Sequence, residues 1–145
     1  MGRLLAADAD VPDVRLAMLG GGALSLREEG ALLLAFFKIS CPVCQLTLPY
    51  LNRIHPNRRV LGVSQNSEHD TRDFVDHFKL DYPILLDPEH RFPASNAFGI
   101  THVPTIFECG ADAHVTRVIE GWNKKEMEAL GAVNASDNVP AWRAG

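Results

Sequence analysis

The hydrophobic pattern of the chain alternates between short apolar runs and segments in which apolar residues recur at helical spacing. Residues 31–37 form an uninterrupted apolar run, which is typical of a strand buried on both faces of a sheet. From Pro42 to residue 54 the apolar positions have helical spacing, and proline suits the first helical position because its missing N–H has no partner there. The pattern predicts a strand, a turn and a helix, which Pro49 should bend.

The alternation continues along the chain. The further predicted elements are, in order, a strand (59–65), a helix (68–78), a strand (82–86), a helix irregular around Pro93 (90–98), two strands (105–108 and 115–120) separated by a turn region, and a closing helix (123–133). This order predicts the α/β class, with strands and helices alternating as in a parallel βαβ arrangement.

The two ends of the chain fall outside this core of residues 31–133. Residues 11–29 are predicted to form an N-terminal extension with a β-hairpin that turns at Gly20-Gly21-Gly22. Residues 134–145 hold few apolar side chains and include Pro140, so we expect a flexible tail. The length of 145 residues is that of one ordinary domain, and we assign 1–145 to a single domain.

Composition and charge exclude some classes of function. The net charge of −4, without a local cluster of Lys and Arg, argues against nucleic-acid binding. The apolar run of residues 31–37 is far shorter than the roughly 20 residues that a membrane helix needs. Residues 1–10 have no sustained apolar core and do not resemble a signal peptide. We therefore expect a cytoplasmic protein, or a periplasmic or extracytoplasmic one whose signal peptide was removed.

The candidate chemistry lies in a C-x-x-C pair, Cys41 and Cys44. A cysteine between a buried strand and a helix lies near the unpaired N–H groups and positive dipole end of that helix, which favours its thiolate. Since the thiolate is the form that attacks a disulfide, Cys41 is predicted to be the attacking sulfur. Cys44, one turn later, is predicted to resolve the mixed disulfide. This redox-active pair requires no added cofactor.

Other interpretations of the C-x-x-C spacing are half of a zinc site, a structural disulfide or two unrelated buried cysteines. A zinc site requires further paired ligands, and His55, His69 and Cys109 form no second pair in the sequence. We expect no metal. Cys109 is interpreted as a small buried residue, with a second resolving or regulatory thiol as the alternative.

Three stretches of the chain resemble the thioredoxin superfamily, and most closely its TlpA/ResA-like, AhpC/TSA-related (redoxin) branch. They are residues 36–44, continued by Leu48-Pro49-Tyr50-Leu51; residues 63–67 through 82–88; and residues 98–107. The resemblance implies a thioredoxin-like fold, with a central mixed β-sheet flanked by helices and a βα insertion in its middle. It also implies a thiol-disulfide oxidoreductase. Its partners would be protein dithiols or disulfides and a protein that recycles the redox pair.

The resemblance also implies the substrate site. In the family, the proline matching Pro104 is cis and faces the cysteine pair, and the backbone before it pairs with a substrate chain. Val103 and Pro104 are therefore expected to line the substrate groove, together with Ser40, Pro42 and Val43.

This chain departs from the family at several positions. Ser40 stands where the family often has Trp, Ala35 where thioredoxin has a buried acid, and Thr47 where ResA-like proteins have Glu. Lys38 and His102 are candidates for tuning the cysteines, and Lys38 or Glu108 for handling the proton of the resolving thiol.

Two other functions compete with disulfide exchange. A thiol peroxidase of the AhpC/TSA type would need Pro seven residues and Thr or Ser three residues before the reactive cysteine, where this chain has Leu34 and Lys38. A non-catalytic binding module could keep the fold and use the groove beside Pro104 for a partner chain.

Overall fold

The computed structural model describes residues 3–145, so the first two residues of the predicted domain lie outside the described part. The elements are, in chain order, β1 (Arg15–Met18), β2 (Ala23–Ser25), β3 (Leu32–Phe37), α1 (Pro42–Tyr50), β4 (Val60–Ser64), α2 (Glu68–Phe78), β5 (Ile84–Leu86), α3 (Pro93–Phe98), β6 (Thr105–Cys109), β7 (Val115–Glu120), β8 (Trp122–Asn123), α4 (Lys124–Leu130) and β9 (Trp142–Arg143), with short 3-10 turns at Leu26–Glu28 and Leu51–Arg53.

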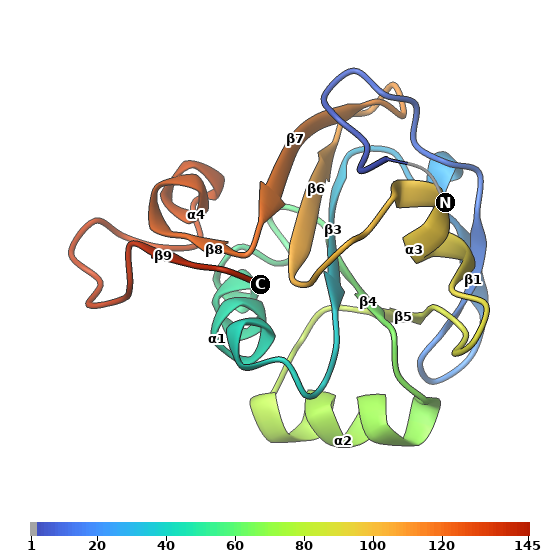
Figure 1. Ribbon diagram of the computed structural model, residues 1–145, viewed down its shortest axis with the longest axis horizontal. Coiled ribbons are helices and arrows are strands. Elements are labelled where there is room, and N and C mark those ends of the chain that lie inside the picture. The colour runs from blue at the N-terminus through green and yellow to red at the C-terminus, as the bar shows by residue number, and fades with distance from the viewer. Residues whose placement is uncertain (1–2) are drawn as a thin grey trace.

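The main sheet has the strand order β2-β1-β5-β4-β3-β6-β7, and helices lie around it (Figure 1). Strand β4 is parallel to β3 and β5, whereas β1 and β6 run antiparallel to their neighbours β5 and β3. The predicted class, a central mixed sheet flanked by helices in a thioredoxin-like arrangement, is confirmed. The predicted N-terminal hairpin is confirmed too, since Arg15 pairs with Ser25 and Ala17 with Ala23.

Strand β3 is the centre of the core. All six of its residues are buried because β4 and β6 flank it on either side in the sheet. Phe36 packs against Phe98 of α3 and Phe107 of β6, with ring centroids 5.1 and 5.8 Å apart. The loop that follows β3 therefore starts from a tightly packed strand.

The predicted elements occur in the predicted order, with differences at their ends. Helix α1 ends at Tyr50, one residue after Pro49, and a 3-10 turn continues it to Arg53. Helix α3 begins only at Pro93, because Phe92 before it takes a left-handed conformation (φ 45°). Among residues 3–145, none of the helices has the length and apolar character needed to cross a membrane.

Residues 134–145, which the sequence predicts to form a flexible tail, make specific contacts with the rest of the domain. Strand β9 pairs antiparallel with β8, and the indole N–H of the wholly buried Trp122 donates to the Pro140 carbonyl oxygen at 2.6 Å. Asp137 forms an ion pair with Arg53 at 2.6 Å, and the Lys124 ammonium donates to two tail carbonyls. These contacts are hydrogen bonds and one ion pair rather than the apolar packing that the sequence pattern registers.

Candidate active site

Cys41 lies at the N-terminus of α1, directly after the turn that leaves β3 (Figure 1). It is the N-cap residue, in extended conformation, and Pro42 begins the first turn as expected for a residue without an N–H. The Cys44 backbone N–H donates to the Cys41 sulfur at 3.1 Å. The sulfur thus receives one of the N–H groups that a helix start leaves unpaired, which stabilises negative charge on it.

Cys44 lies one turn further along α1 and is wholly buried. Burial raises the pKa of its thiol well above the ordinary value of 9.0, and the Cys41 side chain raises it further. A backbone hydrogen bond and the positive charge of Lys38 act in the opposite direction on this pKa. The two cysteines therefore differ in the way that attack and resolution require, with one accessible sulfur and one protected, protonated thiol. Both are free thiols in this structure.

The Val103–Pro104 peptide bond is cis, as the resemblance implies. The segment faces the cysteine pair, because the Cys41 thiol donates to the Val103 carbonyl oxygen at 3.5 Å. Val103 and Pro104 are both buried, and the Thr105 hydroxyl donates to the His102 carbonyl oxygen at 2.9 Å, which holds the bend that precedes β6. Cys41 and Val103, which lie 62 positions apart in the sequence, are thus in direct contact.

Two side chains that the sequence pattern did not single out hold the loop between β3 and Cys41. The Ile39 N–H donates to the Asn66 side-chain oxygen at 2.9 Å, and the Gln45 amide donates to the Ile39 carbonyl oxygen at 2.9 Å. Both backbone groups of Ile39 are therefore satisfied by side chains. No local motif marks such contacts, since Asn66 lies 27 residues away and is brought near by the pairing of β4 with β3.

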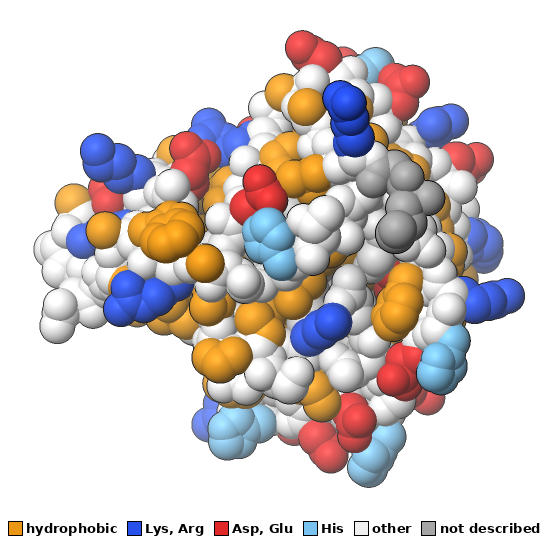
Figure 2. Space-filling view, in the orientation of Figure 1, with side chains coloured by type: hydrophobic (Ala, Val, Ile, Leu, Met, Phe, Trp, Pro, Cys, Tyr) orange, Lys and Arg blue, Asp and Glu red, His pale blue; other side chains and the backbone are white. Residues whose placement is uncertain are grey.

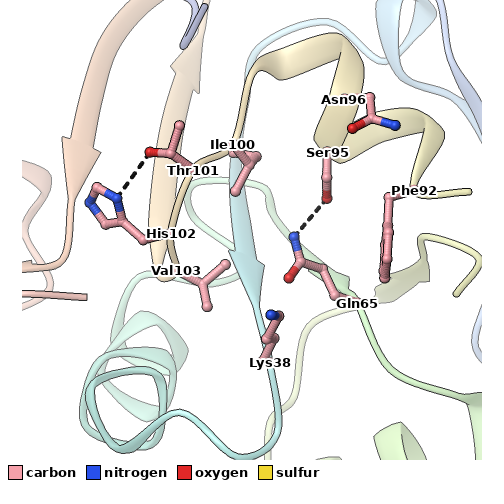
Figure 3. Close-up of a pocket in the computed structure, with 9 residues that line it drawn as sticks. All are labelled: Lys38, Gln65, Phe92, Ser95, Asn96, Ile100, Thr101, His102 and Val103. Carbon is pink, nitrogen blue, oxygen red and sulfur yellow. Dashed lines mark hydrogen bonds between the residues drawn. The ribbon is translucent and has the colours of Figure 1, made fainter. Parts of the chain in front are cut away.

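A hollow of about 190 Å³ opens beside this site, between the loop after β3 and the segment before Pro104 (Figure 3). Its lining includes Lys38, Phe92 and Val103, and on its floor Gln65 donates to the Ser95 hydroxyl at 2.8 Å. That hydroxyl donates in turn to the wholly buried Asp87 at 2.6 Å. This hydrogen-bonded chain, also missed from the sequence, fixes the Gln65 amide in the lining of the hollow.

The remaining predicted site residues vary in their distance from the chemistry. Ser40 and Pro42 are exposed next to Cys41, and Val43 is half-buried on the first turn of α1. Lys38 is exposed at the end of β3 and contributes to the electrostatics of Cys44. The His102 ring contacts Glu120 at 3.2 Å and the Thr101 hydroxyl at 3.0 Å, so its polar partners are not the cysteines.

The positions that differ from the family carry no acid at the site. Ala35 is wholly buried in β3, and the Thr47 hydroxyl is already used, donating to the Val43 carbonyl oxygen at 2.7 Å. Glu108 is on β6 opposite Leu33, at the far end of β3 from Cys41, where it pairs with Arg58 at 2.7 Å. Glu108 is therefore not placed to take a proton from Cys44.

Cys109 also lies at that far end, because it pairs with Leu32 at the start of β3, whereas Cys41 follows the end of β3. It is buried, and burial together with the charge of Glu108 raises the pKa of its thiol to about 12. The interpretation of Cys109 as a small buried residue fits this position. The position does not fit a role as a second resolving thiol, since Cys109 and Cys41 lie at opposite ends of β3.

Comparisons with known proteins agree with this geometry. A sequence model of the AhpC/TSA family matches residues 7–118. The chain is 28% identical over 131 residues to the thiol-disulfide oxidoreductase ResA of Geobacillus thermodenitrificans, covering 84% of this chain and 74% of that protein. It is 24% identical over 126 residues to ResA of Bacillus thuringiensis strain Al Hakam, covering 81% and 72% of the two chains.

Solved structures show the same fold. The thioredoxin domain of a thiol-disulfide oxidoreductase from Bacteroides vulgatus superposes with a TM-score of 0.75 at 19% identity, covering 90% of this chain and 99% of that one. A thio-disulfide isomerase from Thermus thermophilus gives a TM-score of 0.69 at 18% identity, covering 88% and 97%. With a family model matching most of its length, a thioredoxin-like fold and relatives named thiol-disulfide oxidoreductases, the chain belongs to the AhpC/TSA family.

Proposed function

We propose that this protein exchanges disulfides with protein partners through Cys41 and Cys44. The observation that carries the proposal is the pairing of a partly exposed Cys41 sulfur, which receives the Cys44 N–H at 3.1 Å, with the cis Val103–Pro104 segment beside it. One group attacks, a second lies within one helical turn to resolve, and the backbone segment that would pair with a partner chain lies beside the attacking sulfur.

The exchange proceeds in two displacements. The Cys41 thiolate attacks one sulfur of a partner disulfide, so that a mixed disulfide forms and the other partner sulfur leaves as a thiolate that takes up a proton. Cys44 then loses its proton and attacks the Cys41 sulfur, which releases the second partner thiolate and leaves a Cys41–Cys44 disulfide. A recycling dithiol returns the pair to its reduced form. Run in reverse, the same steps oxidise a partner dithiol.

The test is reduction of insulin disulfides by wild type, Cys41→Ser and Cys44→Ser, with dithiothreitol as recycling reductant. We expect Cys41→Ser to fall to the rate of dithiothreitol alone. Reduced Cys44→Ser, mixed with insulin after dithiothreitol has been removed, should accumulate a covalent insulin adduct visible by mass spectrometry. Cys109→Ser, which changes a thiol at the far end of the sheet, is the matched control and should retain the wild-type rate. Equal rates for wild type and Cys41→Ser would rule the proposal out.

A thiol peroxidase is the second candidate, favoured by the AhpC/TSA family match. Peroxide chemistry would use the same Cys41 sulfur, but Leu34 is buried in β3 and Lys38 is exposed at its end, where peroxidases of this type use Pro and Thr or Ser. Hydrogen peroxide consumption by the same set of variants separates the two activities. Consumption that depends on Cys41, without insulin reduction, would favour the peroxidase.

A further inference from the structure

The C-terminal segment of the chain crosses the candidate substrate groove. Residues 141–145, here called the strap, leave Pro140 and pair with β8, so that Trp142 opposes Asn123 and Arg143 opposes Trp122. Beyond β9 the strap continues to Val103. A side-chain carbon placed on Gly145 would overlap the Val103 carbonyl oxygen and lie 3.1 Å from the His102 ring. In Figure 1 the C-terminus lies beside the lower end of β6, close to α1.

The strap touches the same carbonyl oxygen that accepts the Cys41 thiol at 3.5 Å. Under the proposed function, the backbone of Val103 is where a partner chain pairs while its disulfide is attacked. Two extended chains cannot occupy the backbone of one residue on the same side. The strap and a partner chain therefore compete for this position.

The contact also shows what kind of chain fits there. Gly145 lies so close to Val103 that any side chain on it would collide with Val103. A second glycine, Gly121, lets the strap backbone lie close to β8, since a side-chain carbon on Gly121 would lie 2.5 Å from the Arg143 carbonyl oxygen. Space for an extended backbone is present, but space for a side chain against Val103 is not. The surface consequently suits an extended segment with glycine at this contact.

The attachment of the strap differs from that of the residues before it. Residues 141–145 are all exposed, and Trp142 keeps 59% of its surface in solvent. The strap is held by the β8–β9 pairing and the hydrogen bond from the Lys124 N–H to the Ala141 carbonyl oxygen, 2.9 Å. Residues 134–140 have stronger attachments, which include the Arg53–Asp137 ion pair and the Trp122–Pro140 hydrogen bond. Segments with few buried contacts open most readily, so opening begins after Pro140.

We propose that the strap is an internal occupant of the partner-binding groove, and that an extended, glycine-containing segment of the partner displaces it to pair with Val103. This inference rests on the proposed function. Figure 2 shows apolar side chains over α1 and beside the C-terminal segment, so a displacing chain would meet an apolar surface there. A small disulfide needs no pairing with Val103. The strap should therefore slow the reaction of Cys41 with an extended partner chain and leave its reaction with a small disulfide unchanged.

The experiment compares two substrates, a ten-residue peptide with a mixed disulfide to thionitrobenzoate and the small disulfide cystamine. Gly145→Val, which collides with Val103, and deletion of residues 141–145 should each speed the peptide reaction at least about threefold, since the binding-competent fraction rises. The cystamine rate should change by less than about twofold on the same grounds. Ala141→Val, which adds bulk at an exposed strap residue that precedes the β8–β9 pairing, is the control and should match wild type.

Addition of the strap in trans provides a second readout. The amidated peptide Ala-Trp-Arg-Ala-Gly should inhibit the peptide reaction of the deletion variant, whereas Ala-Trp-Arg-Ala-Val should not. Unchanged peptide rates in both strap variants, or equal acceleration toward cystamine, would overturn the strap proposal. Failure of the disulfide-exchange proposal would be recognised separately, because Cys41→Ser would then react with the peptide as fast as wild type.

Discussion

The two cysteines of the candidate site lie in different environments, which suit the different tasks proposed for them. Cys41 is partly exposed and receives the Cys44 N–H, whereas Cys44 is wholly buried and its pKa is raised mainly by that burial. Neither Ala35 nor Thr47 provides a carboxylate beside Cys44, and the Thr47 hydroxyl is committed to the Val43 carbonyl. Deprotonation of Cys44 is therefore the difficult part of the proposed exchange.

This raised pKa predicts a pH-dependent release step. Because the Cys44 thiolate fraction grows with pH below the pKa, release of product from the Cys41 mixed disulfide should accelerate about tenfold per pH unit between pH 7 and 9. Single-turnover release from a preformed mixed disulfide measures this step, and Cys44→Ser isolates the preceding attack. A release rate that levels off below pH 8 would contradict the raised pKa.

Asp87 stabilises the start of helix α3 from another part of the chain. From the end of β5 its wholly buried carboxylate accepts the N–H groups of Ala94 and Ser95 at 2.9 and 2.8 Å and the Ser95 hydroxyl at 2.6 Å. These N–H groups belong to the first turn of α3, which has no side-chain cap from Phe92. Asp87 therefore supplies the N-terminal cap of α3, which Phe92 directly before the helix does not supply.

Removal of this carboxylate should destabilise the fold. In Asp87→Ala two buried N–H groups and the Ser95 hydroxyl lose their acceptor, which costs about 3 kcal/mol of unfolding free energy. Urea unfolding of wild type and variant measures the loss. Glu89→Ala, an exposed carboxylate in the same loop, is the control and should change the unfolding free energy by less than about 0.5 kcal/mol. A loss below about 1 kcal/mol for Asp87→Ala would indicate that water replaces the carboxylate.

Elements with local signals could be predicted from the sequence, and those held by distant partners could not. Helix α2 has the predicted bounds because Ser67 caps its first turn, accepting the Asp70 N–H at 3.2 Å. The cysteine turn was predictable for the same reason, since strand, proline and helix are adjacent in the chain. Strand β9 was missed because its partner is β8, on the far side of α4 in the sequence, where Trp122 opposes Arg143. The Asn66 and Asp87 contacts likewise depend on how strands pair.

On the scale of the whole molecule, buried thiols link stability to pH. Burial raises the pKa of Cys44 above 9.0 and that of Cys109 to about 12, the latter with a contribution from the charge of Glu108. In the unfolded chain both thiols lose their protons near their ordinary value, whereas the folded protein keeps them. The unfolded state therefore binds fewer protons above pH 9, and stability falls as pH rises.

The expected slope is up to about 1.4 kcal/mol of unfolding free energy per pH unit for each thiol above pH 9. Urea unfolding under reducing conditions from pH 7 to 10.5 measures it. Cys109→Ala removes one thiol at the far end of the sheet and should have a shallower decline than wild type. Parallel curves for the two proteins would show that Cys109 ionises alike in the folded and unfolded states.

The N-terminal hairpin has a consequence for how copies of this protein meet in concentrated solution. Because β1 adds to β5, the outermost strand on that side of the sheet is β2, which spans three residues, Ala23–Ser25. So short a strand offers a neighbouring molecule few free backbone groups, and short edge strands are one way in which proteins avoid edge-to-edge aggregation. The hairpin thus shields the longer inner strands from edge-to-edge pairing with a neighbouring molecule.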